Sequence, residues 1–129
     1  MKRRFIVNTF TKLGKEELEL WFSGVEGEGE YKEWDNNGQL WVHGFYKNGK
    51  KHGELKRWDS DGQIYVHCFY KNGQIDGKYR KWHENGQLMH QSFYKDGEAN
   101  GDYKDWYDDG ELQSHKLYKD GKIIKDYLA

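Results

Sequence analysis

Residues 53–76 read GELKRWDSDGQIYVHCFYKNGQID, and this 24-residue stretch decides the fold because the chain repeats it without a gap. Copies of the same length begin at Gly29, Gly77 and Gly101. The four units cover residues 29–52, 53–76, 77–100 and 101–124. Tandem repetition of one short unit is typical of an array in which each unit packs only against its neighbours.

Each unit contains two Asx-Gly pairs, which favour hairpin turns because both residues tolerate the positive φ of a type I′ turn. The eight pairs are Asn37-Gly38, Asn48-Gly49, Asp61-Gly62, Asn72-Gly73, Asn85-Gly86, Asp96-Gly97, Asp109-Gly110 and Asp120-Gly121. The segments between them, such as residues 39–46 and 63–70, are rich in Trp, Tyr, Phe and Val, which suits strands. The sequence therefore predicts an all-β fold, an elongated antiparallel β-meander built from 24-residue hairpin repeats.

The direction of the side chains is harder to derive. Within a regular strand Tyr31 and Trp34 face opposite ways, and so do Leu40 and Phe45. Either both sheet faces carry aromatic rows or a bulge resets the alternation, and the sequence leaves both readings open.

The two ends of the chain depart from the repeat. Residues 1–28 align with it when slid by 24 positions, and we predict a degenerate N-terminal unit or cap there. The alignment places Phe10 on Trp34, Gly14 on Gly38, and Trp21-Phe22 on Phe45-Tyr46. Strand is favoured in this segment, with an amphipathic helix over residues 15–22 as the alternative. Residues 125–129 are predicted to form a polar C-terminal cap, so residues 1–129 make a single repeat domain.

Composition limits the function. Apolar residues are 35% of the chain but aromatic residues reach 17%, so large rings must bury the surface. A net charge of −1 disfavours electrostatic binding of nucleic acid. The single Cys68 cannot form an internal disulfide, which fits a cytoplasmic location. No continuous apolar segment indicates a signal peptide or a membrane span.

The pattern GxYxxWxxxGxLxxxxFYKxGxxxG, which covers about 100 of the 129 residues, resembles MORN repeats. It resembles in particular the variant of the bacterial YwqK-family antitoxins and of repeat-rich proteins of large DNA viruses. This resemblance implies an elongated β-meander with a binding or scaffolding role and no catalysis.

Histidines recur at one repeat position, His43, His67 and His115, where the third unit has Gln91. Zinc–nitrogen bonds are ~2.1 Å long. Equivalent positions in successive repeats are expected ~9.6 Å apart, because one strand lies between them. These residues are therefore predicted to be ordinary strand-face histidines, and no metal site is expected.

The sequence offers no catalytic constellation. Cys68 shares its repeat position with Gly44, Ser92 and Lys116, which indicates a tolerant site and a packed thiol. Neither a GxSxG elbow nor a phosphate-binding glycine loop is present. We predict neither enzyme activity nor a cofactor.

Repetition within the chain separates packing from binding. Positions fixed by packing should recur in every unit, and the recurring aromatic rows are Trp34, Trp58, Trp82, Trp106, Tyr46, Tyr70, Tyr94 and Tyr118. Two other rows change from apolar to polar residues along the chain, and in the fourth unit they contain Gln113 and Ser114. The partner-binding candidates drawn from those rows, with the adjacent histidines, are Trp41, Val42, His43, Tyr65, Val66, His67 and Met89.

Two classes of function fit these patterns. If the candidates are exposed on one face, they form an apolar patch of the kind that marks a protein interface, and the chain is a protein-binding scaffold, antitoxin or viral or phage inhibitor. Alternatively, this half of the sheet packs against the N-terminal segment and the candidates have only a structural role. The alternative class is a binder of anionic lipid surfaces through the turn lysines Lys47, Lys71, Lys95 and Lys119. The partner's identity and the pairing of copies, end to end or along an edge, stay open.

Overall fold

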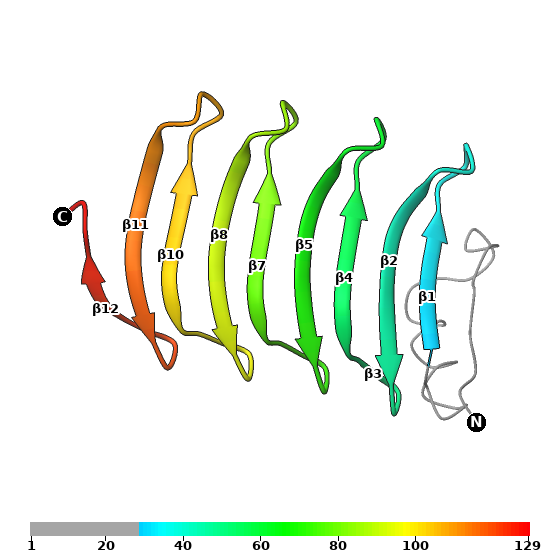
Figure 1. Cartoon of the computed structure of the whole chain (residues 1–129), viewed down its shortest axis with the longest axis horizontal. Helices are drawn as coiled ribbons and strands as arrows, with labels where there is room; N and C mark the ends of the chain where they lie inside the picture. Colours follow the sequence, from blue (N-terminus) through cyan, green and yellow to red (C-terminus); the bar gives the residue numbers. More distant parts are fainter. Residues whose placement is uncertain (1–28) are drawn as a thin grey trace.

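The computed structural model describes residues 29–129, which form one antiparallel sheet of twelve strands (Figure 1). The long strands are β1 (Gly29–Trp34), β2 (Leu40–Lys47), β4 (Gly53–Trp58), β5 (Ile64–Lys71), β7 (Gly77–Trp82), β8 (Leu88–Lys95), β10 (Gly101–Trp106), β11 (Leu112–Lys119) and β12 (Lys122–Asp126). The short strands are β3 (Lys50–Lys51), β6 (Gln74–Ile75) and β9 (Glu98–Ala99). The described residues contain no helix, and the all-β prediction is confirmed.

The long strands lie side by side in chain order, so the sheet grows by one hairpin per repeat. Figure 1 shows the resulting elongated, curved single layer, with β1 at one end and β12 at the other. The short strands extend the pairing of β2, β5 and β8 beyond their turns. The predicted meander is therefore confirmed, whereas the unit predicted over residues 1–28 lies outside the described residues.

The turns that follow β2, β5, β8 and β11 are the predicted tight turns. Asn48 and Gly49 have φ of 52° and 76°, and the other three pairs at this edge have the same signs. Both central residues of a type I′ turn need positive φ. Consecutive turns are also joined, because the Gly73 N–H donates to the Lys51 carbonyl at 2.8 Å and later repeats copy the bond.

The turns at the opposite edge are different, and the type I′ expectation is wrong there. At Asn37-Gly38 only the glycine has positive φ, 80°. The connection is a wider loop over residues 35–39, in which the Asp35 carboxylate accepts the N–H groups of Asn37 and Gln39, each at 2.9 Å. Asp59 makes the same pair of bonds in the second repeat. A side chain that satisfies the loop backbone allows this wider geometry.

A β-bulge recurs in every hairpin. Glu33 pairs with Val42 but Trp34 pairs with Leu40, so Trp41 is the extra residue of the bulge. The same shift makes Tyr65, Met89 and Gln113 the extra residues in the later repeats. The bulge reading of the sequence is thus correct, and the extra residue resets the alternation of β2 between Leu40 and Val42.

The two faces of the sheet both carry aromatic side chains, so the prediction of aromatic rows on both faces is also confirmed. The tyrosine face holds the buried cluster of Tyr31, Val42, Tyr46, Leu55, Val66 and Cys68. Tyr31 and Tyr46 meet edge to face there at 5.7 Å, and Tyr79 and Tyr94 at 6.0 Å. The phenylalanine face carries Phe45 and Phe69, which lie beside His43 and His67 at 5.0 and 5.1 Å.

The aromatic residues that were predicted to be structural are not all equally buried. Tyr46 is 7% exposed, whereas Tyr70, Tyr94, Tyr118 and the four tryptophans of the repeats are only half-buried. A single-layer sheet cannot enclose large rings from both sides, which explains the partial exposure.

The C-terminal end of the sheet exposes apolar side chains of the fourth unit and of residues 125–129, for which the polar cap stays a prediction. Ile123 and Ile124 are 51% and 58% exposed in β12, and Leu128 is 55% exposed. Each earlier repeat starts its strand with a glycine at positive φ, for example Gly77 at 102°, but Lys125 occupies that position in the last segment. A lysine disfavours that conformation, and β12 pairs with β11 in a different register, Lys116 against Asp126.

Candidate binding face

The bulge residues lie on the tyrosine face. Trp41 and Tyr65 pack against the buried cluster that contains Val42 and Val66, so the bulge turns two consecutive side chains to the same side. These bulge residues line pockets in the surface of the sheet. Trp41 lines a pocket of about 130 Å³, Tyr65 and Met89 line a second of about 410 Å³, and Met89 and Gln113 line a third of about 500 Å³.

The sequence-derived patch does not form as one surface. Val42 and Val66 are 3% and 7% exposed, so they belong to the core and offer little area to a partner. His43 and His67 follow them directly in the strand and project from the phenylalanine face. The premise that all candidates share one exposed face is therefore wrong. Trp41, Tyr65 and Met89 remain together at the pockets of the tyrosine face.

The tyrosine face also contains a polar cluster that sequence reasoning missed. His90 is 8% exposed, with Nδ1 2.8 Å from Asp105 Oδ1 and Nε2 2.8 Å from Ser92 Oγ. The rings of Tyr79 and Tyr103 flank His90 at 5.8 and 4.6 Å. The sequence does contain a sign of this pair. His90 replaces the valine of the first two repeats, and Asp105, which pairs with it across β8 and β10, replaces the lysine and arginine of the two preceding repeats.

The connections Asp105–His90–Ser92 repeat the order of groups in a nucleophilic triad. Ser92, however, is 0% exposed, so no substrate can reach its oxygen. The other nucleophile on this face is equally inert, because burial raises the pKa of the Cys68 thiol to about 11 and the residue is 1% exposed. The cluster therefore satisfies buried polar groups, and neither Ser92 nor Cys68 is an accessible nucleophile.

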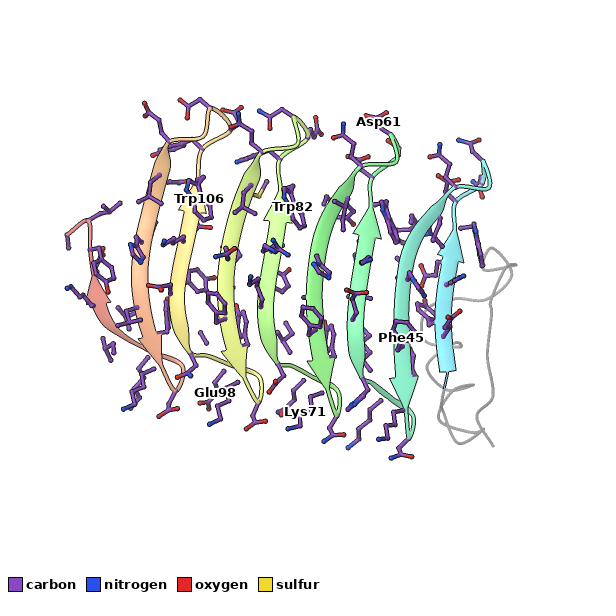
Figure 2. All side chains as sticks on the ribbon, viewed as in Figure 1. Phe45, Asp61, Lys71, Trp82, Glu98 and Trp106 are labelled. Carbon is purple, nitrogen blue, oxygen red and sulfur yellow. The ribbon has the colours of Figure 1, made fainter. Side chains whose placement is uncertain are left out.

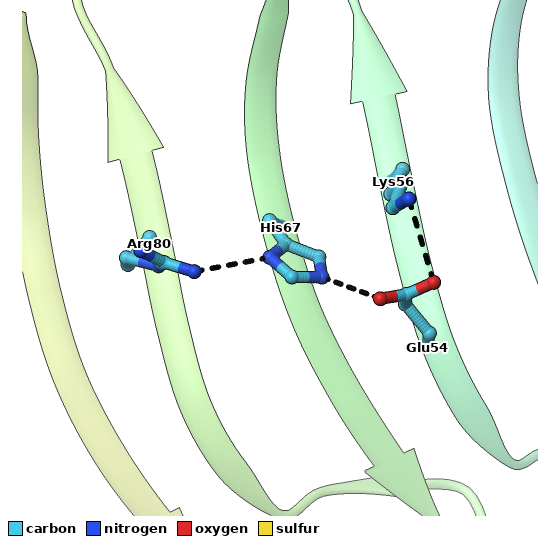
Figure 3. Close-up of polar contacts among 4 residues, drawn as sticks. All are labelled: Glu54, Lys56, His67 and Arg80. Carbon is cyan, nitrogen blue, oxygen red and sulfur yellow. Dashed lines mark hydrogen bonds and ion pairs between the residues drawn. The ribbon is translucent and has the colours of Figure 1, made fainter.

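The phenylalanine face carries a chain of polar contacts across β4, β5 and β7 (Figure 3). His67 Nε2 lies 2.8 Å from Glu54 Oε2, and its Nδ1 lies 3.5 Å from an Arg80 nitrogen. Lys56 completes the chain with an ion pair to Glu54 at 3.6 Å. In the fourth repeat His115 pairs with Asp102 at 2.8 Å. The described part of the chain brings together no three His, Cys, Asp or Glu side chains that could hold a metal ion.

Acid should weaken this face in two stages. Burial lowers the pKa of His43, assisted by Lys32, whereas Glu30 opposes the shift. The hydrogen bond from His67 is the main cause that lowers the pKa of Glu54. Both folded-state values lie below the unfolded ones, so each group stabilises the fold above its ordinary pKa and loses this contribution as the pH falls through the folded value. The His43 stage begins below pH 6.5 and the Glu54 stage below pH 4.5.

We therefore expect His43→Gln, which copies Gln91, to reduce the acid sensitivity of the protein. The free energy of unfolding, measured by urea titration at about pH 7.5 and pH 5.5, should fall less in the variant than in the wild type. Equal losses in the two proteins would show that the His43 environment does not disfavour its charged form.

The turn lysines lie along one edge of the sheet, and all four are exposed. Figure 2 shows Lys71 on this edge together with Glu98, and Asp61 at the opposite edge. Acidic residues at the same turns, such as Asp96, Glu98 and Asp120, reduce the net positive charge of this edge. The opposite loops form an acidic edge without lysine or arginine, whose acids are Asp35, Asp59, Asp61, Glu84, Asp108, Asp109 and Glu111.

The comparisons with known proteins agree with this architecture. Residues 27–48, 51–72, 75–96 and 99–120 each match the family model described as MORN repeat variant. The chain therefore belongs to the MORN repeat variant family, whose repeats are generally modules that bind proteins or membranes and are not typically catalytic. No curated protein and no solved structure matches the chain. Among the described residues no helix is long and apolar enough to cross a membrane.

Proposed function

We propose that this chain is a non-catalytic protein-binding module that acts by occupying a surface of its partner with its tyrosine face. One observation carries the proposal. The bulge residues, which change from repeat to repeat as Trp41, Tyr65, Met89 and Gln113, line successive pockets on this face. Aromatic and methionine side chains around concave apolar surface are typical of interface centres.

The biological form of such a module would be a scaffold, an antitoxin-like neutraliser or a viral or phage inhibitor. Each of these roles needs only a stable surface that covers part of another protein. The buried, unreactive Cys68 fits a reducing compartment, and we place the module in the cytoplasm as part of the same proposal.

The matched test exchanges residues that the chain itself interchanges. Tyr65→Gln copies Gln113 on the tyrosine face, and Phe69→Leu copies Leu117 on the phenylalanine face. A partner captured from the native host is identified by mass spectrometry, purified, and titrated against each variant by calorimetry. We expect about tenfold or greater weakening for Tyr65→Gln, as for an interface aromatic, and little change for Phe69→Leu.

Melting curves accompany both titrations, because Tyr65 also packs against the core and its replacement costs some stability. Weakening by Phe69→Leu alone, with Tyr65→Gln folded and fully active, would place the partner on the wrong face and remove the proposal.

The lipid alternative rests on the exposed lysine row at one edge. Juxtaposed acids weaken the attraction of this row to an anionic surface. Co-sedimentation with anionic liposomes at about 0.15 M salt separates the two classes, because electrostatic binding is screened but not abolished there. Absence of pelleting removes the lipid function.

A further inference from the structure

The second pocket of the tyrosine face combines apolar walls with two cations. Leu55, Val66 and Cys68 belong to its lining, together with the rings of Tyr65 and Tyr79. Arg57 and Lys81 line the same pocket. Arg57 pairs with Val66 across β4 and β5, and Lys81 pairs with Val66 across β5 and β7. The two cations therefore stand on either side of one buried valine, with backbones about 9.6 Å apart.

These cations are specific to the two central repeats. The same repeat position is Glu33 in the first unit and Asp105 in the fourth, and Asp105 is already bound to His90. No carboxylate of residues 29–129 lies within ion-pair distance of Arg57 or Lys81. The Lys81 ammonium instead lies 5.8 Å from the centre of the Tyr79 ring.

The surroundings of Arg57 are partly dehydrated. Burial raises the pKa values of Tyr70 and Tyr79, and the positive charge of Arg57 opposes the shift in both, as it does for Cys68. Glu33 is the carboxylate in line with Arg57, but Val42 lies between their strands. The half-buried guanidinium of Arg57 has therefore lost hydration that no ion pair within the described residues replaces. A carboxylate placed there would form charge-assisted hydrogen bonds, which are stronger than neutral ones.

We propose that this pocket binds an acidic peptide segment of the partner, with a carboxylate held between Arg57 and Lys81 and an adjacent apolar side chain packed over the Val66–Cys68 floor. The proposal rests on the proposed function and names the chemistry of its partner. A membrane or a nucleic acid fits less well, because both present many anionic groups. The pocket has only two cations among its tyrosines and can contact only one or two such groups. The acidic edge beyond β4 and β7 repels an extended phosphate array.

The test uses the whole protein as bait for a phage-displayed library of random dodecapeptides. We expect the selected peptides to carry more Asp and Glu than Lys and Arg, beside at least one aromatic or aliphatic residue. A selected peptide is then synthesised with a fluorophore and titrated by fluorescence polarisation. Replacement of its carboxylates by amides should weaken binding about tenfold or more, the effect of losing a charge-assisted hydrogen bond.

Matched protein variants locate the charge effect. Lys81→Gln and Arg57→Gln should each lower the affinity about tenfold, whereas Lys56→Gln, which removes the same charge from the opposite face of β4, should leave it unchanged. Melting curves establish that each variant is folded. The amide peptide keeps the test independent of any variant that fails to fold.

The inference would be overturned if the selected peptides were neutral or basic, if no peptide were enriched, or if Lys56→Gln and Lys81→Gln lost the same affinity. Binding of anionic vesicles that depends on Arg57 and Lys81 would also overturn it, in favour of a membrane. If neutral peptides are selected and still need Tyr65, the acidic segment is wrong but the binding face stands. If no selected peptide needs Tyr65, the proposed function fails as well.

Discussion

Cys68→Lys is expected to unfold the centre of the sheet, although the fourth repeat carries a lysine at the same position. The Cys68 side chain is 1% exposed, and the nearby Arg57 and Lys51 already supply positive charge to its surroundings. A buried uncompensated charge costs about 3 kcal/mol or more. That is a large share of the roughly 5–15 kcal/mol that stabilises a typical domain. Urea unfolding followed by circular dichroism measures the loss.

The control is the reverse exchange in the last repeat. Lys116 is half-buried and lies beside the C-terminal strand β12, so Lys116→Cys should change the free energy of unfolding by no more than about 0.5 kcal/mol. A Cys68→Lys protein as stable as the wild type would show that the tyrosine face is not a packed core at its centre.

Leu55→Ala is expected to lower the free energy of unfolding by about 2–5 kcal/mol, the range for truncation of a buried leucine. Leu55 is 7% exposed and belongs to the buried cluster. A Cβ on Gly44 would lie 2.9 Å from Leu55 Cδ1, which shows how closely the leucine fills the space beside β2. Its removal leaves a cavity that the neighbouring glycine cannot fill.

Leu112→Ala makes the same chemical change at a residue that is 41% exposed, and we expect an effect within about 0.5 kcal/mol. Equal losses in the two alanine variants would contradict the assignment of the core to the tyrosine face of the first three repeats.

The repeat made most of the fold predictable. An Asx-Gly pair at fixed spacing predicts both a turn and the antiparallel pairing of the two strands that it joins. The order of the strands in the sheet therefore follows from their order in the chain. The pairs at Asn48-Gly49 and its equivalents have the expected backbone, whereas Asn37-Gly38 does not. There Asp35, two residues before the pair, satisfies the loop backbone with its side chain and changes the turn.

The candidate face was predictable only in part. The rows that change from repeat to repeat drew attention to Trp41, Tyr65 and Met89, which line the pockets of the tyrosine face. The direction of these side chains depends on the bulge, which only the pairing with the neighbouring strand defines. The packed thiol predicted at position 68 is confirmed by its burial, as Gly44 and Ser92 are buried at the equivalent positions. Lys116 takes the same place in the fourth repeat, where it is only half-buried near the end of the sheet. The His90–Asp105 pair joins residues of two repeats, and a comparison of equivalent positions does not reveal such a contact.

The most direct measurement of the central claim is hydroxyl-radical footprinting of the protein with and without saturating partner. If the tyrosine face is the binding surface, Tyr65 and Met89 should be protected in the complex, while Phe69 and Phe93 on the opposite face should be oxidised at their free rates. Protection of Phe69 and Phe93 with unchanged oxidation of Tyr65 and Met89 would contradict the account.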